Sequence, residues 1–119
     1  MKKITDEQFT KALEAVVKER GEDYTYPREE ENPDYWILGS CVYQVEGRPA
    51  CIIGAAIAHL GGDLAGISSQ NTNPGKAVKE AGLEVSGSVS IAMSVAQRAQ
   101  DIGKTWGDAL RAYYDYFWQ

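Results

Sequence analysis

Residues 49–60 read PACIIGAAIAHL, and no Asp, Glu, Lys or Arg interrupts this run. A helix that is apolar on every side is buried in the protein interior. Pro49 suits the first turn of such a helix, where its missing N–H needs no partner. Gly54, Ala55 and Ala58 are small, so another element can approach closely. We therefore expect a buried central helix over residues 49–60.

Four other segments carry helical patterns. Thr5 followed by Gln8 has the spacing of a capping box, in which each side chain meets the backbone N–H of the other residue. Thr105 likewise offers a cap before the last amphipathic segment. These patterns predict helices over residues 5–20, 73–82, 88–102 and 105–117. The helix over 88–102 is expected to face the core through Val89, Ala92, Val95, Ala99 and Ile102.

One short ribbon completes the expected fold. Residues 41–45 are rich in β-formers and precede the turn residues Glu46-Gly47-Arg48. We expect them to pair with Tyr24–Tyr26 in an antiparallel ribbon. The predicted fold is α+β and mostly helical, with about five helices and one two-stranded ribbon. The first and last helices should wrap the central helix in a single domain over residues 1–119.

The charge balance argues against nucleic acid as the main partner. The chain of 119 residues has a net charge of −5 and a pI near 4.8. Residues 1–40 carry ten Asp or Glu and six Lys or Arg. Acidic surfaces repel phosphate backbones. The sequence shows neither an apolar segment of membrane-spanning length nor the apolar core of a signal peptide, so we expect a cytoplasmic protein without membrane contact.

The few residues with catalytic or metal-binding chemistry form no familiar motif. Cys41, Cys51 and His59 are spaced Cys-x9-Cys-x7-His, which matches no usual zinc site. We expect two reduced, buried thiols; a Cys41–Cys51 disulfide closing a short loop remains the alternative. On one helix Cys51 and His59 would lie roughly 12 Å apart, too far for proton transfer. These residues and Glu29–Glu31 are the raw material for an enzyme, but we expect no cofactor, no metal and no catalysis.

Aromatic residues provide the stronger candidates for a binding surface. Tyr and Trp are enriched at protein interfaces, and they occur in the acidic loop 22–36 and in the last helix. The loop has an alternative role, with its aromatic side chains folded onto the core. The last helix carries more aromatic residues than one buried face holds, which favours self-association or partner docking. The candidate surface comprises Tyr35, Trp36, Trp106, Tyr113, Tyr116 and Trp118.

A nucleic-acid function is the alternative from another class. The segment 95–114 has the outline of a helix-turn-helix, with Gly103 in the turn. Its second helix offers Asp108 and Asp115 but only Arg111 as a basic residue. Basic and amide side chains read base edges, so two core helices joined by a glycine turn is the more ordinary interpretation.

Three segments, CVY (41–43), GRPACIIG (47–54) and QDIGKTWGDA (100–109), resemble small uncharacterised actinobacteriophage proteins, mycobacteriophage proteins in particular. The resemblance implies a phage product acting in the cytoplasm of a bacterial host. It implies no reaction and no functional residue. The function we expect is that of a non-catalytic accessory protein that binds a host or phage protein, or a second copy of itself as a homodimer.

Overall fold

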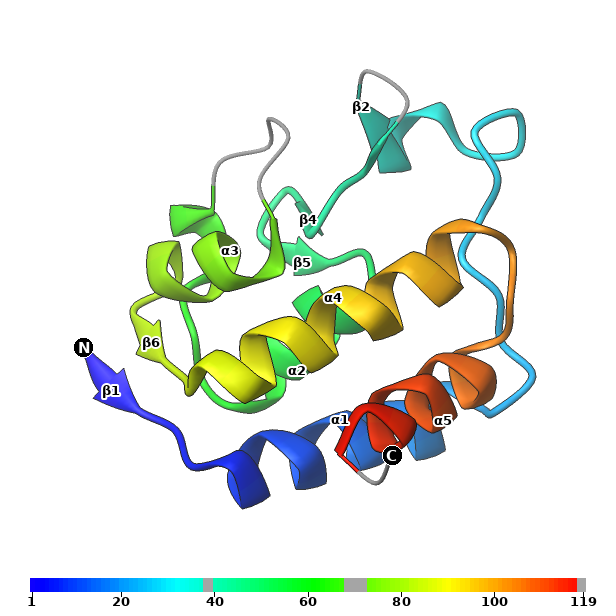
Figure 1. Ribbon diagram of the computed structural model, residues 1–119. Helices are drawn as coiled ribbons and strands as arrows, with labels where there is room; N and C mark the ends of the chain where they lie inside the picture. The colour runs from blue at the N-terminus through cyan, green and yellow to red at the C-terminus, as the bar shows by residue number, and fades with distance from the viewer. Residues whose placement is uncertain (38–39, 68–72, 118–119) are drawn as a thin grey trace.

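Five α-helices make up most of the described chain (Figure 1). The computed structural model describes residues 1–37, 40–67 and 73–117. The five helices and the short strand pairs confirm the predicted mostly helical α+β fold. The helices are α1 (Asp6–Arg20), α2 (Ile52–His59), α3 (Pro74–Glu80), α4 (Gly87–Asp101) and α5 (Trp106–Phe117). The strands are β1 (Lys2–Lys3), β2 (Trp36–Ile37), β3 (Ser40–Cys41), β4 (Gln44–Val45), β5 (Arg48–Pro49) and β6 (Leu83–Glu84).

The strands form short pairs whose partners differ from the predicted ribbon. β1 pairs in parallel with β6, while β2–β3 and β4–β5 are antiparallel. Pairing of Tyr24–Tyr26 with residues 41–45 is therefore wrong, and Thr25 forms a bridge with Thr105 instead. Glu46 and Gly47 both have positive φ angles, of 54° and 76°. Such a two-residue turn closes β4 and β5 into their own hairpin.

The predicted helix caps are confirmed. The Gln8 N–H donates to Thr5 Oγ1 at 3.0 Å, and the Thr5 N–H donates to Gln8 Oε1 at 2.8 Å. Thr105 Oγ1 accepts the N–H of Asp108 at 3.1 Å, at the start of α5. These bonds satisfy N–H groups that the first turn of a helix leaves without a partner. The N-terminal ends of α1 and α5 are thus set by residues next to them in the sequence.

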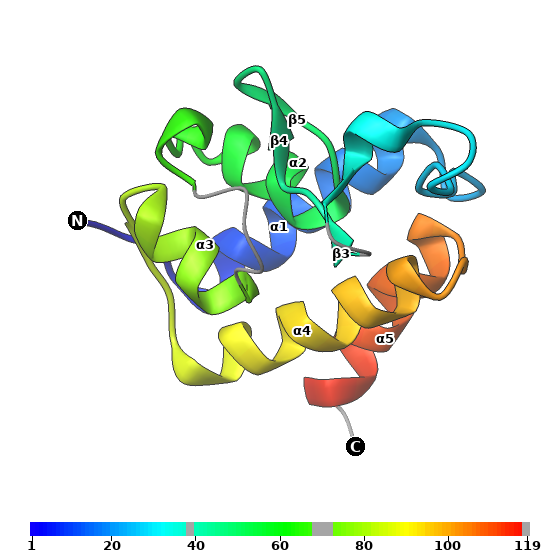
Figure 2. The same ribbon diagram turned by 90° about the horizontal axis from the view of Figure 1, so that it is seen from above.

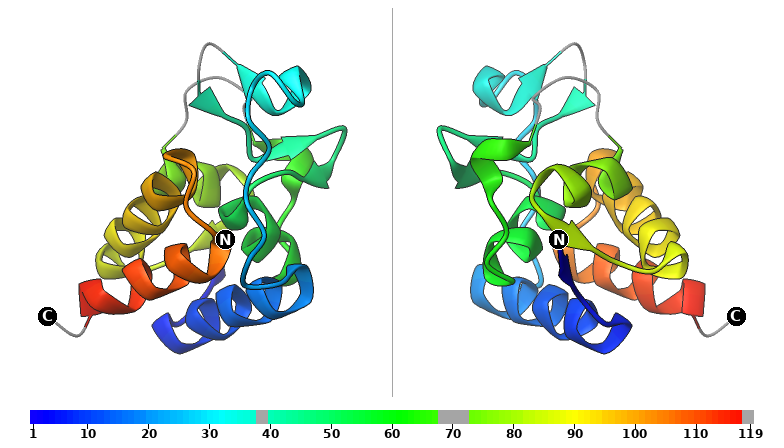
Figure 3. Two further views of the ribbon diagram at one scale, coloured as in Figure 1. Left: turned by 90° about the vertical axis from the view of Figure 1, so that its right-hand side faces the viewer. Right: turned by 90° about the vertical axis from the view of Figure 1, so that its left-hand side faces the viewer.

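The helices lie on two sides of the molecule. Figure 3 shows α4 and α5 on one side and α1 and α2 on the other. α2 lies against α1 and α4, whereas α5 packs against α4 and α1. The first helix therefore packs against the central helix as expected, whereas α5 makes most of its contacts with α4 and α1. One cluster of buried side chains, with members from every helix, fills the space between them.

α2 begins later than predicted, and its first turn is buried. Pro49 belongs to β5, and Cys51 is the N-cap of α2, its Sγ accepting the Gly54 N–H at 3.3 Å. The Ile52 N–H donates to Oε1 of Gln100, on α4, at 2.8 Å. Gln100 is only 1% exposed. Two side-chain acceptors, one local and one distant, therefore satisfy backbone donors that water does not reach.

Close packing around Gly54 confirms that the small residues of α2 allow an element to approach. A Cβ atom at Gly54 would lie 2.0 Å from the backbone oxygen of Tyr43. That oxygen accepts the Ala50 N–H at 3.0 Å, so it is held in place. Only glycine fits at this position without displacing the segment before the β4–β5 hairpin.

None of the helices in the described ranges combines the length and the apolar character that crossing a bilayer requires.

Replacing Gly54 with Ala should lower the free energy of unfolding by about 2–3 kcal/mol, because the added methyl overlaps a fixed carbonyl. Gly87→Ala is the matched control, since a Cβ there meets nothing within 4 Å. The control should change stability by less than about 1 kcal/mol. Urea denaturation of both variants measures the difference, and equal effects would contradict this packing.

Gln100→Met keeps the side-chain length but removes the acceptor for the Ile52 N–H. The unfolding free energy should fall by about 1–3 kcal/mol, the cost of a buried unsatisfied donor. Native-state hydrogen exchange of the Ile52 amide should accelerate at the same time. An unchanged exchange rate would show that another group satisfies this N–H.

Candidate functional site

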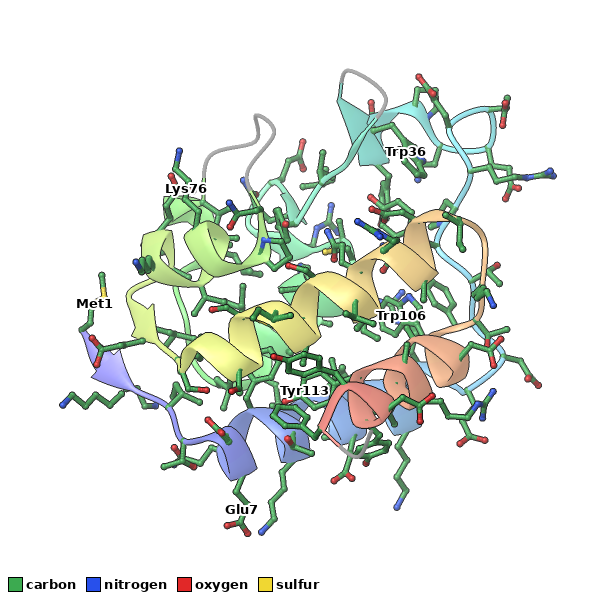
Figure 4. All side chains as sticks on the ribbon, in the orientation of Figure 1. Met1, Glu7, Trp36, Lys76, Trp106 and Tyr113 are labelled. Atoms are coloured by element: carbon green, nitrogen blue, oxygen red, sulfur yellow. The ribbon has the colours of Figure 1, made fainter. Side chains whose placement is uncertain are left out.

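Two predicted surface residues belong to the core. Trp106 and Tyr113 are both 0% exposed, and Figure 4 shows their labelled side chains within the helical part of the molecule. The Tyr113 hydroxyl is hydrogen-bonded to Thr10 Oγ1 at 3.0 Å, which ties α5 to α1. Neither residue is part of a docking surface on the folded chain, because both lie on the face of α5 that packs inward.

The acidic loop folds its aromatic side chains around Tyr26. Tyr26 is buried, and its ring centroid lies 5.7 Å from Tyr35 and 5.2 Å from Trp36. The Trp36 indole N–H donates to the carbonyl oxygen of Pro27 at 2.7 Å. Tyr35 and Trp36 are half-buried against the core. This arrangement matches the structural alternative for the loop and leaves only part of each ring at the surface.

The end of α5 presents a smaller aromatic surface than expected. Tyr116 is half-buried and packs against Phe117, with ring centroids 5.4 Å apart. Phe117 and Tyr114 line a groove of 390 Å³ against α1, whose other wall is mainly acidic. The Tyr114 hydroxyl donates to Glu14 across this groove. Trp118 lies outside the described residues.

Apart from Met1, the exposed large apolar side chains among the described residues lie on α4 or at its C-cap, Ile102. Ile91, Val95 and Ile102 are 53%, 37% and 67% exposed. Together with Arg98 they follow the spacing i, i+4, i+7, i+11, which puts them on one line along the helix. We call Ile91, Val95, Arg98 and Ile102 the α4 stripe. In Figure 1, α4 crosses in front of α2, on the near side of the molecule.

The position of the stripe corrects the predicted core face of this helix. Val89, Ala92 and Ala99 are buried as expected, but Val95 and Ile102 are not. Gln100 faces inward to cap α2, and at 100° per residue it lies opposite Ile91. The sequence pattern missed this because a buried glutamine is indistinguishable from a surface one without its partner. The sequence signal for a second, exposed face of this helix is the line of apolar residues at positions 91, 95 and 102.

A groove of 440 Å³ runs beside the stripe, between α4 and α5. Val95, Arg98 and Ile102 form one wall, and Asp108, Arg111 and Asp115 belong to the other. Arg111 forms an ion pair with Asp108. The hydrogen bond from Arg111 lowers the pKa of the Asp108 carboxyl, and the same bond raises the pKa of Arg111. The basic groups of this groove are thus interspersed with carboxylates.

The relative orientation of α4 and α5 does not favour the helix-turn-helix alternative. α4 and α5 run side by side in opposite directions in both views (Figures 1 and 2). A DNA-binding helix-turn-helix sets its helices at a steep angle, so that the second enters the major groove. Here α5 packs along α4, as in an antiparallel helical hairpin, and Asp108 occupies its first turn.

The candidate catalytic residues lie apart. Cys51 is a free, fully buried cysteine whose sulfur caps α2, and His59 is the exposed last residue of the same helix. The Cys41 side chain lies outside what the structure describes. Within residues 1–37, 40–67 and 73–117, no three side chains of His, Cys, Asp or Glu converge as metal ligands do. The observed role of Cys51 is to satisfy a backbone donor.

No protein-family model matches the chain, and comparison with curated proteins and with solved structures gives no match either.

Tyr113 should make stability sensitive to alkaline pH. Burial raises its pKa above the ordinary value of 10.0. A group with a raised folded-state pKa stabilises the fold below its unfolded pKa, and this contribution disappears as pH rises through the folded pKa. Tyr113→Phe should cost about 1 kcal/mol at pH 7 through the lost Thr10 bond. Above pH 10.0, the free energy of unfolding of this variant should fall less steeply than that of the wild type. Denaturation curves from pH 7 to 11 test both effects, and parallel pH profiles would contradict them.

Proposed function

We propose that this protein is non-catalytic and acts by protein–protein association, with a second copy of itself as the partner and the α4 stripe as the contact. The exposure of Ile91, Val95 and Ile102 carries this proposal. Exposed apolar side chains that line up along one helix mark interaction sites more often than isolated ones do. The stripe replaces the aromatic surface that the sequence suggested.

The spacing of the stripe supports a coiled-coil type of contact. Residues 91, 95, 98 and 102 are separated by four, three and four positions, the alternation of a and d positions in a heptad. Arg98 occupies one of these positions. Its aliphatic stem can cover a neighbouring apolar side chain while the guanidinium stays in water.

The same spacing supports a second copy as the partner. A two-fold interface brings the same patch of both copies together, so the patch must be self-complementary. The separations four, three and four read the same in both directions. Two antiparallel α4 helices therefore place Ile91 of one copy opposite Ile102 of the other, and Val95 opposite Arg98.

The cellular setting belongs to the same proposal. The resemblance of residues 41–43, 47–54 and 100–109 to actinobacteriophage proteins supports a phage accessory protein in the host cytoplasm. The mixed charges of the groove beside the stripe favour a protein surface over a phosphate backbone, which attracts concentrated positive charge.

Ile91→Glu should disrupt the dimer, because it places a carboxylate in the apolar contact. Sedimentation velocity over a wide concentration range should show wild-type monomers and dimers in exchange. The dissociation constant of the variant dimer should be more than about tenfold higher, which corresponds to about 1.4 kcal/mol. Circular dichroism should show unchanged helicity, since Ile91 is more than half exposed.

The matched control is Ala65→Glu, which adds one carboxylate at an exposed position away from α4. It should dimerise like the wild type. A wild-type chain that stays monomeric at every concentration would contradict self-association. A dimer that Ile91→Glu leaves intact would contradict the α4 stripe as its contact.

A further inference from the structure

The groove between α1 and the end of α5 is open to a ligand and separate from the α4 stripe. Figures 1 and 3 show these two helices side by side. The groove has a volume of 390 Å³, which is within the range of small-molecule sites. Tyr114 and Phe117 form the α5 wall, and most of the surface inside the groove is apolar. None of the described residues that line it belongs to the α4 stripe, so its occupant is independent of the proposed dimer.

The α1 wall of this groove has an excess of negative charge. It carries three carboxylates and one amine, which belong to Asp6, Glu7, Glu14 and Lys11. The Lys11 amine lies 3.1 Å from a Glu7 carboxylate oxygen, and the two form an ion pair. Among the described residues, no cation lies within ion-pair distance of Asp6 or Glu14. The wall therefore keeps two negative charges that the protein does not neutralise.

Hydroxyl groups hold these two carboxylates in place. The Ser86 hydroxyl donates to Asp6 Oδ1 at 2.7 Å. The Tyr114 hydroxyl donates to Glu14 Oε2. A hydroxyl donor orients a carboxylate but leaves its charge uncompensated. Burial is the main cause of the raised pKa of the neighbouring Tyr113 hydroxyl, and the charges of Asp6 and Glu14 raise that pKa further. Both side chains are thus positioned anions whose field reaches the α5 side of the groove.

The two anions stand at the two ends of the α1 wall. Asp6 and Glu14 are the first and last residues of α1 that line the groove. Eight residues separate them, which corresponds to roughly 12 Å along the helix axis. Thr10, which also lines the groove, lies midway between them. Across from this stretch are the rings of Tyr114 and Phe117. A ligand that neutralises both charges must therefore be long, with a cation at each end and an apolar middle.

We propose that this groove binds a linear polyamine, with one ammonium group on Asp6 and another on Glu14. Each ammonium donates a charge-assisted hydrogen bond to a carboxylate that has no counter-charge in the protein. The alkyl chain between them lies against the rings of Tyr114 and Phe117, since aromatic faces attract ammonium groups and accept methylene groups. A basic peptide offers the same charges, but its backbone polar groups would lose water against this apolar surface without finding partners. The polyamine is therefore the occupant that the groove favours.

Spermidine is the probe, titrated into the full chain at low and constant ionic strength, where charge pairs are least screened. Calorimetry measures the affinity, and the backbone amide signals of α1 should shift saturably. 1,8-Diaminooctane has the same number of bonds between its terminal nitrogens as spermidine, so it should bind too. Putrescine is too short to reach both carboxylates, and octylamine has one ammonium; each should bind about fivefold more weakly than 1,8-diaminooctane. A trilysine peptide that binds more tightly than spermidine would overturn the polyamine as occupant.

Asp6→Asn and Glu14→Gln each remove one charge but keep an acceptor for the neighbouring hydroxyl. Each should weaken spermidine binding by about threefold to fivefold, the range of one partly exposed ion pair. The double variant should lose about tenfold or more, since the two sites act separately. Glu29→Gln is the matched control, because it removes an exposed carboxylate that does not line the groove, and it should bind like the wild type.

Two results would overturn the proposal. Equal weakening by Glu29→Gln and Glu14→Gln would show general attraction of a polycation to an acidic chain. Absence of heat and of amide shifts up to about 10 mM spermidine would show that the groove has no useful affinity for it. Circular dichroism of each variant checks that α1 is intact, so that a loss of binding reports the charge and not the fold.

Discussion

The N-terminus of α2 is buried, and its backbone N–H groups need acceptors that only the protein can supply. α2 is apolar on every side, so it lies in the interior, where its first N–H groups cannot reach water. Cys51 Sγ and Gln100 Oε1 supply the acceptors for Gly54 and Ile52. Because Gln100 is on α4, one hydrogen bond joins the central helix to the opposite side of the molecule.

This bond also sets the rotation of α4. Gln100 must face α2, and the helical repeat then turns the opposite side of α4 outward. Ile91 lies on that outward side, in line with Val95 and Ile102. The exposed aliphatic stripe therefore lies opposite the side of α4 that carries Gln100 and the buried Ala92 and Ala96. A feature needed for folding and a surface suited to association arise from the same helix orientation.

The local features were predictable from the sequence. The caps of α1 and α5 depend on residues within three positions of each other, and the apolar run 49–60 is enough to place α2 inside. The errors involve distant partners. Gln100 reaches Ile52 across 48 positions, and Thr25 bridges to Thr105, so neither contact leaves a periodic pattern.

The candidate site was harder to predict for the same reason. Trp106 and Tyr113 stand in an unusually aromatic segment, yet contacts with Tyr24 and Thr10 draw them into the core. Val95 and Ile102 have helical spacing with the true core residues, and the sequence does not show that Gln100 is buried while these two residues are exposed. Sequence periodicity identifies a helix face but not which of two faces is buried when both carry apolar residues.

Intermolecular methyl NOEs in a mixed sample, with one copy ¹³C-labelled and the other unlabelled, test whether two α4 helices meet along the α4 stripe. We expect cross-peaks between Ile91 of one copy and Ile102 of the other, as an antiparallel α4 contact requires. Cross-peaks from Ile91 to Ile91 alone, or contacts only from residues outside the α4 stripe, would contradict it.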